Sequence, residues 1–311
     1  MIRLEQTVIS KWLYLSMETR YIDPKSDFAF KKLFQKERNQ ELLIALINAV
    51  VGKQFHQPVV HVTLLDRNLD PEIRTKKESY IDVLCEDQDG CKYVVEMQVA
   101  EEKGFEKRAQ YYAYKTFVGQ MNKGEAYEGL KKVIFISFMN FIQFPDIPRY
   151  KTEHITLEKE SGKNKLDMVS FTFVELPKFE QQRPRDIDQF TQEEAFYYLL
   201  LHANTSTPDI IRKLMGKDYI IKRVFEELNR ASFTEDELIE YEAYQKYILD
   251  SQVREDRIKL EGRAEGRAEG REEGAKSEKI DIATAMLADG ASVDKVKLYT
   301  GLTDEEINTL A

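Results

Sequence analysis

The first 180 residues alternate between helical and strand-like patterns of apolar and polar positions. A start signal at Asp23-Pro24-Lys25-Ser26, with Ser26 as the cap, predicts a short helix that ends near residue 34. Apolar residues at helical spacing predict a second helix over 39–52. Alternating positions predict strands over 59–66, 80–85 and 92–99, and the turn at Asp89-Gly90 joins the last two in a hairpin.

A helix over about 105–123 and two further strands, over 131–138 and 171–176, complete this part of the pattern. Helices and strands in this order predict a mixed α/β sheet flanked by helices. From residue 188 onward the pattern is helical, with helices over 192–202 and 209–228 and a third that starts at a capping box on Thr234. Three short helices over 279–288, 292–298 and 304–310 end the chain.

A four-residue repeat, Glu-Gly-Arg-Ala, separates the helical region from these last helices, over residues 261–271. On a helix the Glu and Arg positions lie on nearly opposite faces, with Gly and Ala between them. Each interior glycine costs roughly 1 kcal/mol relative to alanine, so this helix is not expected to be stable alone. Two interpretations remain open: self-association, in which a second copy matches the Glu stripe with the Arg stripe, and a solvated linker.

These patterns divide the chain into an N-terminal extension (1–20), a core (21–180), a helical region (181–254), a repeat arm (255–278) and a small helical module (279–311). Residues 1–16 are expected to be a poorly structured extension, or Met17 to be the natural start. The last helices suggest a helix-turn-helix, but only Lys295 and Lys297 are basic there. Packing or oligomerisation is therefore favoured over DNA reading for this module.

Composition narrows the function classes. The chain has 311 residues, 42% of them hydrophobic, and a net charge of -9, which suggests about two domains and argues against a protein that coats nucleic acid generally. Cys85 and Cys91 are the two cysteines, and free thiols in a reducing cytosol are expected. No apolar run reaches membrane-spanning length and the N-terminus lacks a signal peptide pattern, so we expect a cytoplasmic protein that does not bind membranes.

The candidate chemistry lies in two neighbouring predicted strands, where Asp82 interrupts one apolar run and Glu96 and Gln98 interrupt the next. Residues two apart on a strand share a face, so two carboxylates and an amide are expected close together. Acidic groups in such positions are costly unless they are paired or bind a metal. Hard oxygen ligands suit Mg²⁺ or Mn²⁺, and Gln98 would lie beside the metal to orient a water or a phosphate oxygen. The alternative is a pair of carboxylates exposed on an open sheet face.

An ordered set of motifs resembles a known family. Asp82 followed by Glu96-x-Gln98 and then a helix looks like the core of the PD-(D/E)xK phosphodiesterases. Together with residues 22–34 and 108–112, it resembles the Rpn family of recombination-promoting nucleases and putative transposases. The Glu-Gly-Arg repeats and residues 300–307 also resemble the tails of that family, so the similarity covers roughly residues 20–311.

The resemblance implies a metal-dependent DNA endonuclease that uses Mg²⁺, with Mn²⁺ as an alternative, and that is linked to recombination or mobile DNA. By position, Asp82 and Glu96 are implied to be metal ligands, assisted by the carbonyl of Met97. Asp27 is either a further ligand or water holder, or an acidic residue that favours a helix N-terminus. Gln98 is implied to be catalytic but replaces the lysine of the wider superfamily, which removes a positive charge from the site.

The helix after the third predicted strand carries the implied DNA contacts. Arg108, Tyr111, Tyr112 and Lys115 share one face of it. Arg108 is expected to contact phosphate, and Tyr111 to stack or to donate a hydrogen bond. The alternative is that both residues are structural. For Tyr112, packing on the sheet is favoured. Alternative functions are a catalytically weak or inactive DNA-binding or assembly protein on the same fold, a phage-defence nuclease, and a multimeric interaction protein.

Overall fold

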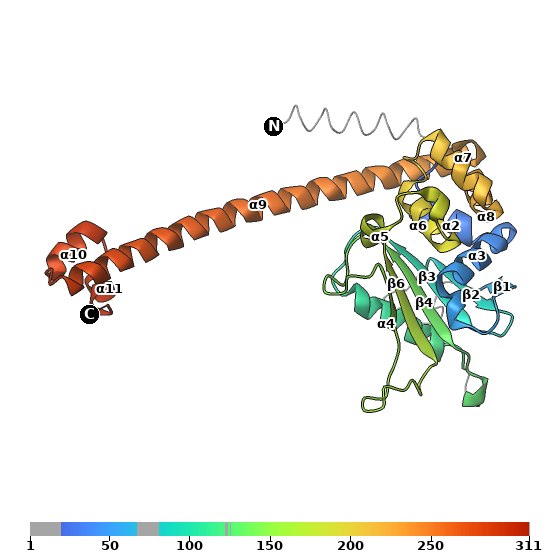
Figure 1. The fold of residues 1–311 in the computed structure, drawn as a ribbon, viewed down its shortest axis with the longest axis horizontal. Coiled ribbons are helices and arrows are strands. Elements are labelled where there is room, and N and C mark those ends of the chain that lie inside the picture. The colour runs from blue at the N-terminus through green and yellow to red at the C-terminus, as the bar shows by residue number, and fades with distance from the viewer. Residues whose placement is uncertain (1–19, 67–80, 122–123, 125, 311) are drawn as a thin grey trace. The chain divides into compact units, whose positions relative to one another are not determined.

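The computed structural model describes residues 20–66, 81–121, 124 and 126–310 (Figure 1). The predicted extension over 1–16 and the alternative start at Met17 lie outside this range. The chain divides into two units, Met1–Tyr241 and Glu242–Ala311.

The first unit is built on one mixed sheet of six strands in the order β1-β2-β3-β4-β6-β5. The strands are β1 (Val62–Leu64), β2 (Val83–Asp87), β3 (Lys92–Gln98), β4 (Val133–Met139), β5 (Lys151–His154) and β6 (Val169–Glu175). Strands β3, β4 and β6 are parallel neighbours, and the other three pairings are antiparallel. The predicted mixed α/β sheet flanked by helices is confirmed.

Helix α4 (Phe105–Val118) covers one face of the sheet, and α2 (Asp27–Phe34), α3 (Gln40–Val51) and α6 (Gln192–His202) cover the other (Figure 1). Val94 of β3 packs under α4 in a buried apolar cluster. Phe138 of β4 points the opposite way, towards the rings of Phe30 on α2 and Tyr197 on α6. Because side chains alternate along a strand, Glu96 and Gln98 lie on the same face as Val94, beside α4.

The segment before α2 fastens the helical layer to this face. Ser26 caps α2 by accepting a hydrogen bond from Ala29 N at 3.2 Å, as predicted. Lys25 donates to the carbonyls of Leu200 and Leu201, and Lys32 donates to the carbonyl of Ser232. Two lysines of the motif over residues 22–34 therefore hold helices together, while Asp27 and Lys31 lie within electrostatic reach of Asp82, just before β2.

The helical region contains α5 (Leu176–Gln182), α6, α7 (Pro208–Lys217) and α8 (Tyr219–Leu228). The single helix predicted over 209–228 is broken, because Asp218 is extended and its carboxylate caps α8 by accepting from Ile220 N at 2.7 Å. Short 3₁₀ turns lie at Glu37–Asn39, Gly52–Gln54, Tyr127–Gly129, Ile187–Gln189 and Arg230–Ser232.

Two strand predictions were wrong in their bounds, and one strand was missed. The strand predicted over 59–66 is confined to Val62–Leu64, and β5 was not predicted, since Lys151–His154 lacks a continuous apolar pattern. The strand predicted over 80–85 begins only at Val83. Asp82 therefore precedes the strand, so the alternation of side chains along β2 does not determine the direction of its side chain.

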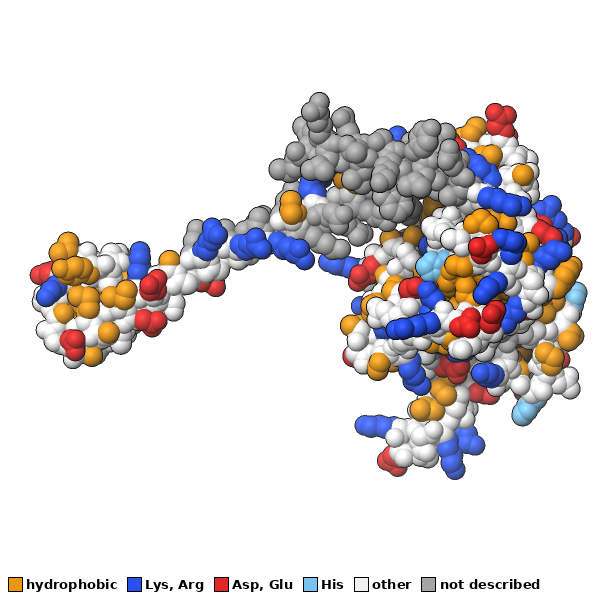
Figure 2. Space-filling model, turned by 45° about the horizontal axis from the view of Figure 1, so that its top comes forward, with side chains coloured by type: hydrophobic (Ala, Val, Ile, Leu, Met, Phe, Trp, Pro, Cys, Tyr) orange, Lys and Arg blue, Asp and Glu red, His pale blue; other side chains and the backbone are white. Residues whose placement is uncertain are grey.

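Helix α9 (Glu235–Ala288) begins in the first unit, and its part in the second unit, from Glu242, includes the Glu-Gly-Arg-Ala repeat. Its first turn carries the predicted capping box, with Thr234 N donating to Glu237 at 2.8 Å. The second unit also contains α10 (Val293–Thr300) and α11 (Asp304–Asn308), packed around a small core at Ala283, Val296 and Ile307. Hydrophobic side chains also lie on its visible surface (Figure 2), and Leu298 and Tyr299 are among its exposed ones.

A buried ion pair at the end of β6 provides a test of this packing. Glu175 is fully buried, accepts from the backbone N–H groups of Gln143 and Phe144, and binds Lys178 Nζ at 2.7 Å. We expect Lys178→Met to lower the free energy of unfolding by about 3 kcal/mol, because it leaves a buried carboxylate without its cation. Urea denaturation measures this. The exposed Lys213→Met, which loses only a 3.7 Å surface pair with Asp188, is the control and should cost less than about 0.5 kcal/mol.

Candidate active site

Asp82 and Glu96 are locked together through the backbone. The Asp82 N–H donates to Glu96 Oε1 at 3.1 Å, and the Met97 N–H donates to Asp82 Oδ2 at 2.9 Å. Each carboxylate thus binds a backbone N–H beside or on the other residue. This arrangement brings together the two acidic residues that the sequence singled out, although Asp82 reaches Glu96 from the turn before β2 and not from the strand itself.

Both carboxyl groups hold their protons unusually tightly. Burial raises the pKa of Asp82 to about 6, partly offset by the hydrogen bond from Met97 N–H. Burial also raises the pKa of Glu96 well above its ordinary value, and the nearby charge of Asp82 adds to that rise. Two buried acids that disfavour being charged together are the groups that a divalent cation stabilises.

Asp27 in the first turn of α2 and Lys31 one turn later both act on Asp82. Asp27 interacts with Asp82 and raises its pKa, whereas the charge of Lys31 lowers it. Lys31 also forms an ion pair with Asp27, four residues earlier on the same helix. Asp27 is therefore close to Asp82 and also occupies the first turn of α2, so its role as a further ligand or water holder and its role as a helix N-terminal charge both stay predictions.

Gln98 and Arg108 lie on the other side of Glu96. Gln98 Nε2 donates to Glu96 Oε2 at 3.0 Å, and Arg108 Nη2 donates to Gln98 Oε1 at 2.5 Å. Arg108 Nη1 pairs with Glu102, and its guanidinium lies 5.1 Å from the ring centroid of Phe105. The amide of Gln98 is therefore occupied by two protein partners, and Arg108 places a positive charge beside Glu96.

The other residues of the α4 face separate into two groups. Tyr112 packs against the apolar cluster under α4, as expected, and its pKa is raised by burial and by the charge of Glu96. Tyr111 is half exposed, and Lys115 Nζ lies 5.2 Å from its ring centroid. Tyr112 is thus the tyrosine within electrostatic reach of the carboxylates, while Tyr111 and Lys115 contact each other.

Comparison with known proteins identifies the fold family. Residues 24–256 match the model for the PD-(D/E)XK nuclease family transposases. The chain belongs to this family. Residues 276–311 match the C-terminal HTH domain of the Rpn/YhgA-like nuclease family, which agrees with the Rpn resemblance. No curated protein and no solved structure matches the chain.

Two consequences follow for this PD-(D/E)XK family member. A nuclease or recombination-related function is supported, and the match to an HTH domain overturns the preference for a mere packing or oligomerisation module at 279–311. The small number of lysines had favoured that interpretation, but the fold of an HTH domain depends on its buried apolar positions and not on its charge. In the described part of the chain, no helix combines the length and the apolar composition that a membrane span needs.

The donor set fits a magnesium ion held partly by water. Within the described residues, no group of three or more His, Cys, Asp or Glu side chains is arranged to hold a metal. Mg²⁺ is, however, commonly held by one or two carboxylates with several waters. Met97 donates its N–H to Asp82, and since a strand residue directs N–H and C=O to the same side, its carbonyl faces the same edge. Asp82, Glu96 and this carbonyl form a suitable oxygen set.

Two residues of the candidate site were not predicted from the sequence. Lys31 could have been found from its i,i+4 spacing to Asp27, which places both on one side of α2. Glu102 lies in the loop before α4, where no periodic pattern signals it, and only the fold shows that its carboxylate pairs with Arg108.

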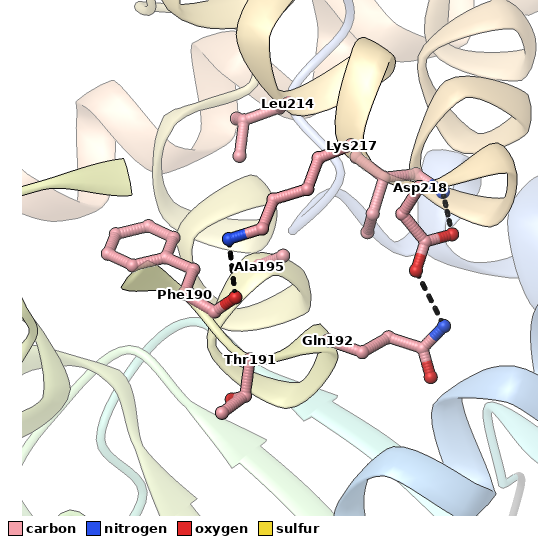
Figure 3. A pocket seen from close by; sticks show the side chains of 8 residues that line it. Phe190, Thr191, Gln192, Ala195, Leu214, Lys217 and Asp218 are labelled. Atoms are coloured by element: carbon pink, nitrogen blue, oxygen red, sulfur yellow. Dashed lines mark hydrogen bonds between the residues drawn. The ribbon is translucent and has the colours of Figure 1, made fainter. Parts of the chain in front are cut away.

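A separate cavity of about 120 Å³ between α6, α7 and α8 offers no comparable chemistry (Figure 3). Lys217 Nζ donates to the carbonyl of Phe190 at 2.7 Å, and Gln192 Nε2 donates to Asp218 at 2.7 Å. The polar groups at this cavity thus bind one another and join the loop before α6 to the α7–α8 turn.

The raised pKa of Asp82 predicts a pH-dependent stability. A carboxyl whose pKa is raised by folding stabilises the protein at low pH, and that contribution is lost as the pH rises from about 4 through about 6. Relative to Asp82→Asn, metal-free wild type should lose about 2 kcal/mol of unfolding free energy between pH 4 and pH 8. Urea denaturation in EDTA at several pH values measures the difference. Parallel pH profiles for the two proteins would show that Asp82 is not perturbed.

Proposed function

We propose that this protein is a metal-dependent DNA endonuclease that hydrolyses phosphodiester bonds with an activated water. The observation that carries the proposal is the pair of half-buried Asp82 and buried Glu96, joined through backbone hydrogen bonds and flanked by Lys31 and Arg108, in a chain of the PD-(D/E)XK family. The family description also supports a role in recombination or the movement of DNA. A cytoplasmic location remains part of the proposal.

The residues divide the work according to their positions. Asp82, Glu96 and the Met97 carbonyl would hold Mg²⁺, or Mn²⁺ in its place, which supplies a bound water of lowered pKa and neutralises charge that develops on the phosphate. Arg108 donates to a phosphate oxygen of the bound strand. Asp27 and Lys31 hold each other at the Asp82 side of the site, where they orient polar groups of the substrate.

Carboxamide substitutions test the enzyme directly. Asp82→Asn and Glu96→Gln keep the shape of each side chain but remove the negative charge that the cation requires. Each should lower the rate of Mg²⁺-dependent plasmid nicking by at least about 100-fold, while binding of plasmid in EDTA persists.

The matched control is Asp89→Asn, which removes an exposed carboxylate in the β2–β3 turn and should nick like wild type. Equal nicking by all four proteins would refute the nuclease assignment. EDTA and added Mg²⁺ or Mn²⁺ identify the metal.

One observation favours a second candidate, a DNA-binding or assembly protein with little catalysis. Gln98 stands where the wider superfamily has lysine, and Arg108 is paired with Glu102 in the structure. In this case wild type would retard a DNA fragment in a gel shift and leave it intact with Mg²⁺. The HTH domain at 276–311 supports DNA binding under either candidate.

Association through the repeat arm is the remaining part of the proposal. Among the described residues, a Cβ atom added at Gly262, Gly266 or Gly270 meets nothing within 4 Å, so no contact described there requires these glycines. Glycine nevertheless costs about 1 kcal/mol per position in a helix, and close approach of a second helix is a physical reason to keep it.

We expect the triple Gly→Ala variant at these positions to gain helicity by circular dichroism but to shift from dimer or higher oligomer towards monomer. Sedimentation velocity measures the shift. Gly216→Ala, at another open helical position, is the control and should leave the mass unchanged. An unchanged oligomer in the triple variant, or a monomeric wild type, would contradict association through this face.

A further inference from the structure

We propose that Gln98 is a positioning residue whose amide holds the guanidinium of Arg108 beside Glu96, so that Arg108 supplies the positive charge that a lysine at position 98 would have supplied. This inference rests on the proposed function. It assigns Gln98 a task different from the expected one of orienting water or phosphate.

The chemistry of the amide carries the first step. Gln98 uses its donor on Glu96 and its acceptor for Arg108, at 3.0 and 2.5 Å. A lysine could donate to Glu96 but could not accept from Arg108, and a glutamate could accept but would repel Glu96. Of these side chains, only the amide satisfies both neighbours at once.

The surroundings of Arg108 carry the second step. Its side chain is about three-quarters buried, its guanidinium lies near the ring of Phe105, and its two terminal nitrogens bind Gln98 and Glu102. Its buried Nε has no hydrogen-bond partner within the described residues. The guanidinium is therefore fixed in one plane, and each terminal nitrogen keeps a second N–H for an acceptor that comes from outside.

The exposure of the two partners carries the third step. Glu102 is 59% exposed and lies in a loop, so a phosphate can take its place against Arg108 Nη1. Gln98 is part of β3 and is tied to the buried Glu96. Gln98 thus keeps Arg108 Nη2 close to Glu96 when a DNA phosphate replaces Glu102. A planar guanidinium held at one edge presents its other edge to two phosphate oxygens.

A double-mutant cycle on metal-free DNA binding tests the inference without relying on cleavage. The variants are Gln98→Met, Arg108→Gln and the combination, with binding of a labelled duplex followed by fluorescence anisotropy in EDTA. Gln98→Met should weaken binding about tenfold in the wild-type background, the size of one charge-assisted hydrogen bond, and less than about twofold when Arg108 is already glutamine.

Additive effects would overturn the inference, as would a Gln98→Met variant that binds like wild type, or a wild type that does not bind the duplex. Gln110→Met, which changes an exposed glutamine on the same helix, should bind like wild type. Circular dichroism melts check that every variant is folded. If wild type binds and the cycle is non-additive but no DNA is cut with Mg²⁺, the proposed nuclease fails while the positioning role stands.

Relocating the charge gives an independent readout. Gln98→Lys alone places two cations together and should slow single-turnover cleavage, and Arg108→Gln alone should slow it at least tenfold. The combination Gln98→Lys with Arg108→Gln restores one cation beside Glu96, and should cleave at least tenfold faster than Arg108→Gln alone. A combination no better than Arg108→Gln would overturn the idea that the two positions share one charge.

Discussion

The candidate site depends on two carboxylates that are kept close together in a largely buried place. Such a pair would repel and would normally be destabilising. The structure offsets this cost with backbone N–H groups: Asp82 N–H binds Glu96, and Met97 N–H binds Asp82. Because one donor belongs to the residue just before β2 and the other to β3, the geometry of the acids is fixed by the backbone and not by flexible side chains.

Two cations lie beside the carboxylate pair. Lys31 approaches Asp82 from α2, and Arg108 approaches Glu96 from α4, on opposite sides of the pair. Each cation also has an acidic partner of its own, Asp27 or Glu102. The acidic groups outnumber the cations before substrate arrives, which leaves room for a divalent cation, and a phosphate can compete with the exposed Glu102 for Arg108. Under the proposed function, this exchange of partners is how an acidic chain would bind DNA locally.

The structure assigns different tasks to the charged residues of the motif over residues 22–34. Lys25 and Lys32 bind carbonyls of the helical region and hold it against α2. Asp27 and Lys31 stay near Asp82. One short motif thus serves both the packing of helices and the candidate site, because Asp27 and Lys31 are four apart and share a side of α2, whereas Lys25 precedes the helix and Lys32 lies on another side of it.

The sequence alone determined the mixed sheet, the order of its main elements, the caps at Ser26 and Thr234, and the acidic and amide residues of the candidate site. Periodicity and capping are local properties, so a single sequence is enough to show them. The tertiary structure decided the rest. It placed Asp82 in the turn before β2, broke the helix at Asp218, and added β5 at the sheet edge. It also brought Lys31 and Glu102 to the site and tied Gln98 to Arg108, because these contacts join elements whose relative positions are set only when both faces of the sheet are covered.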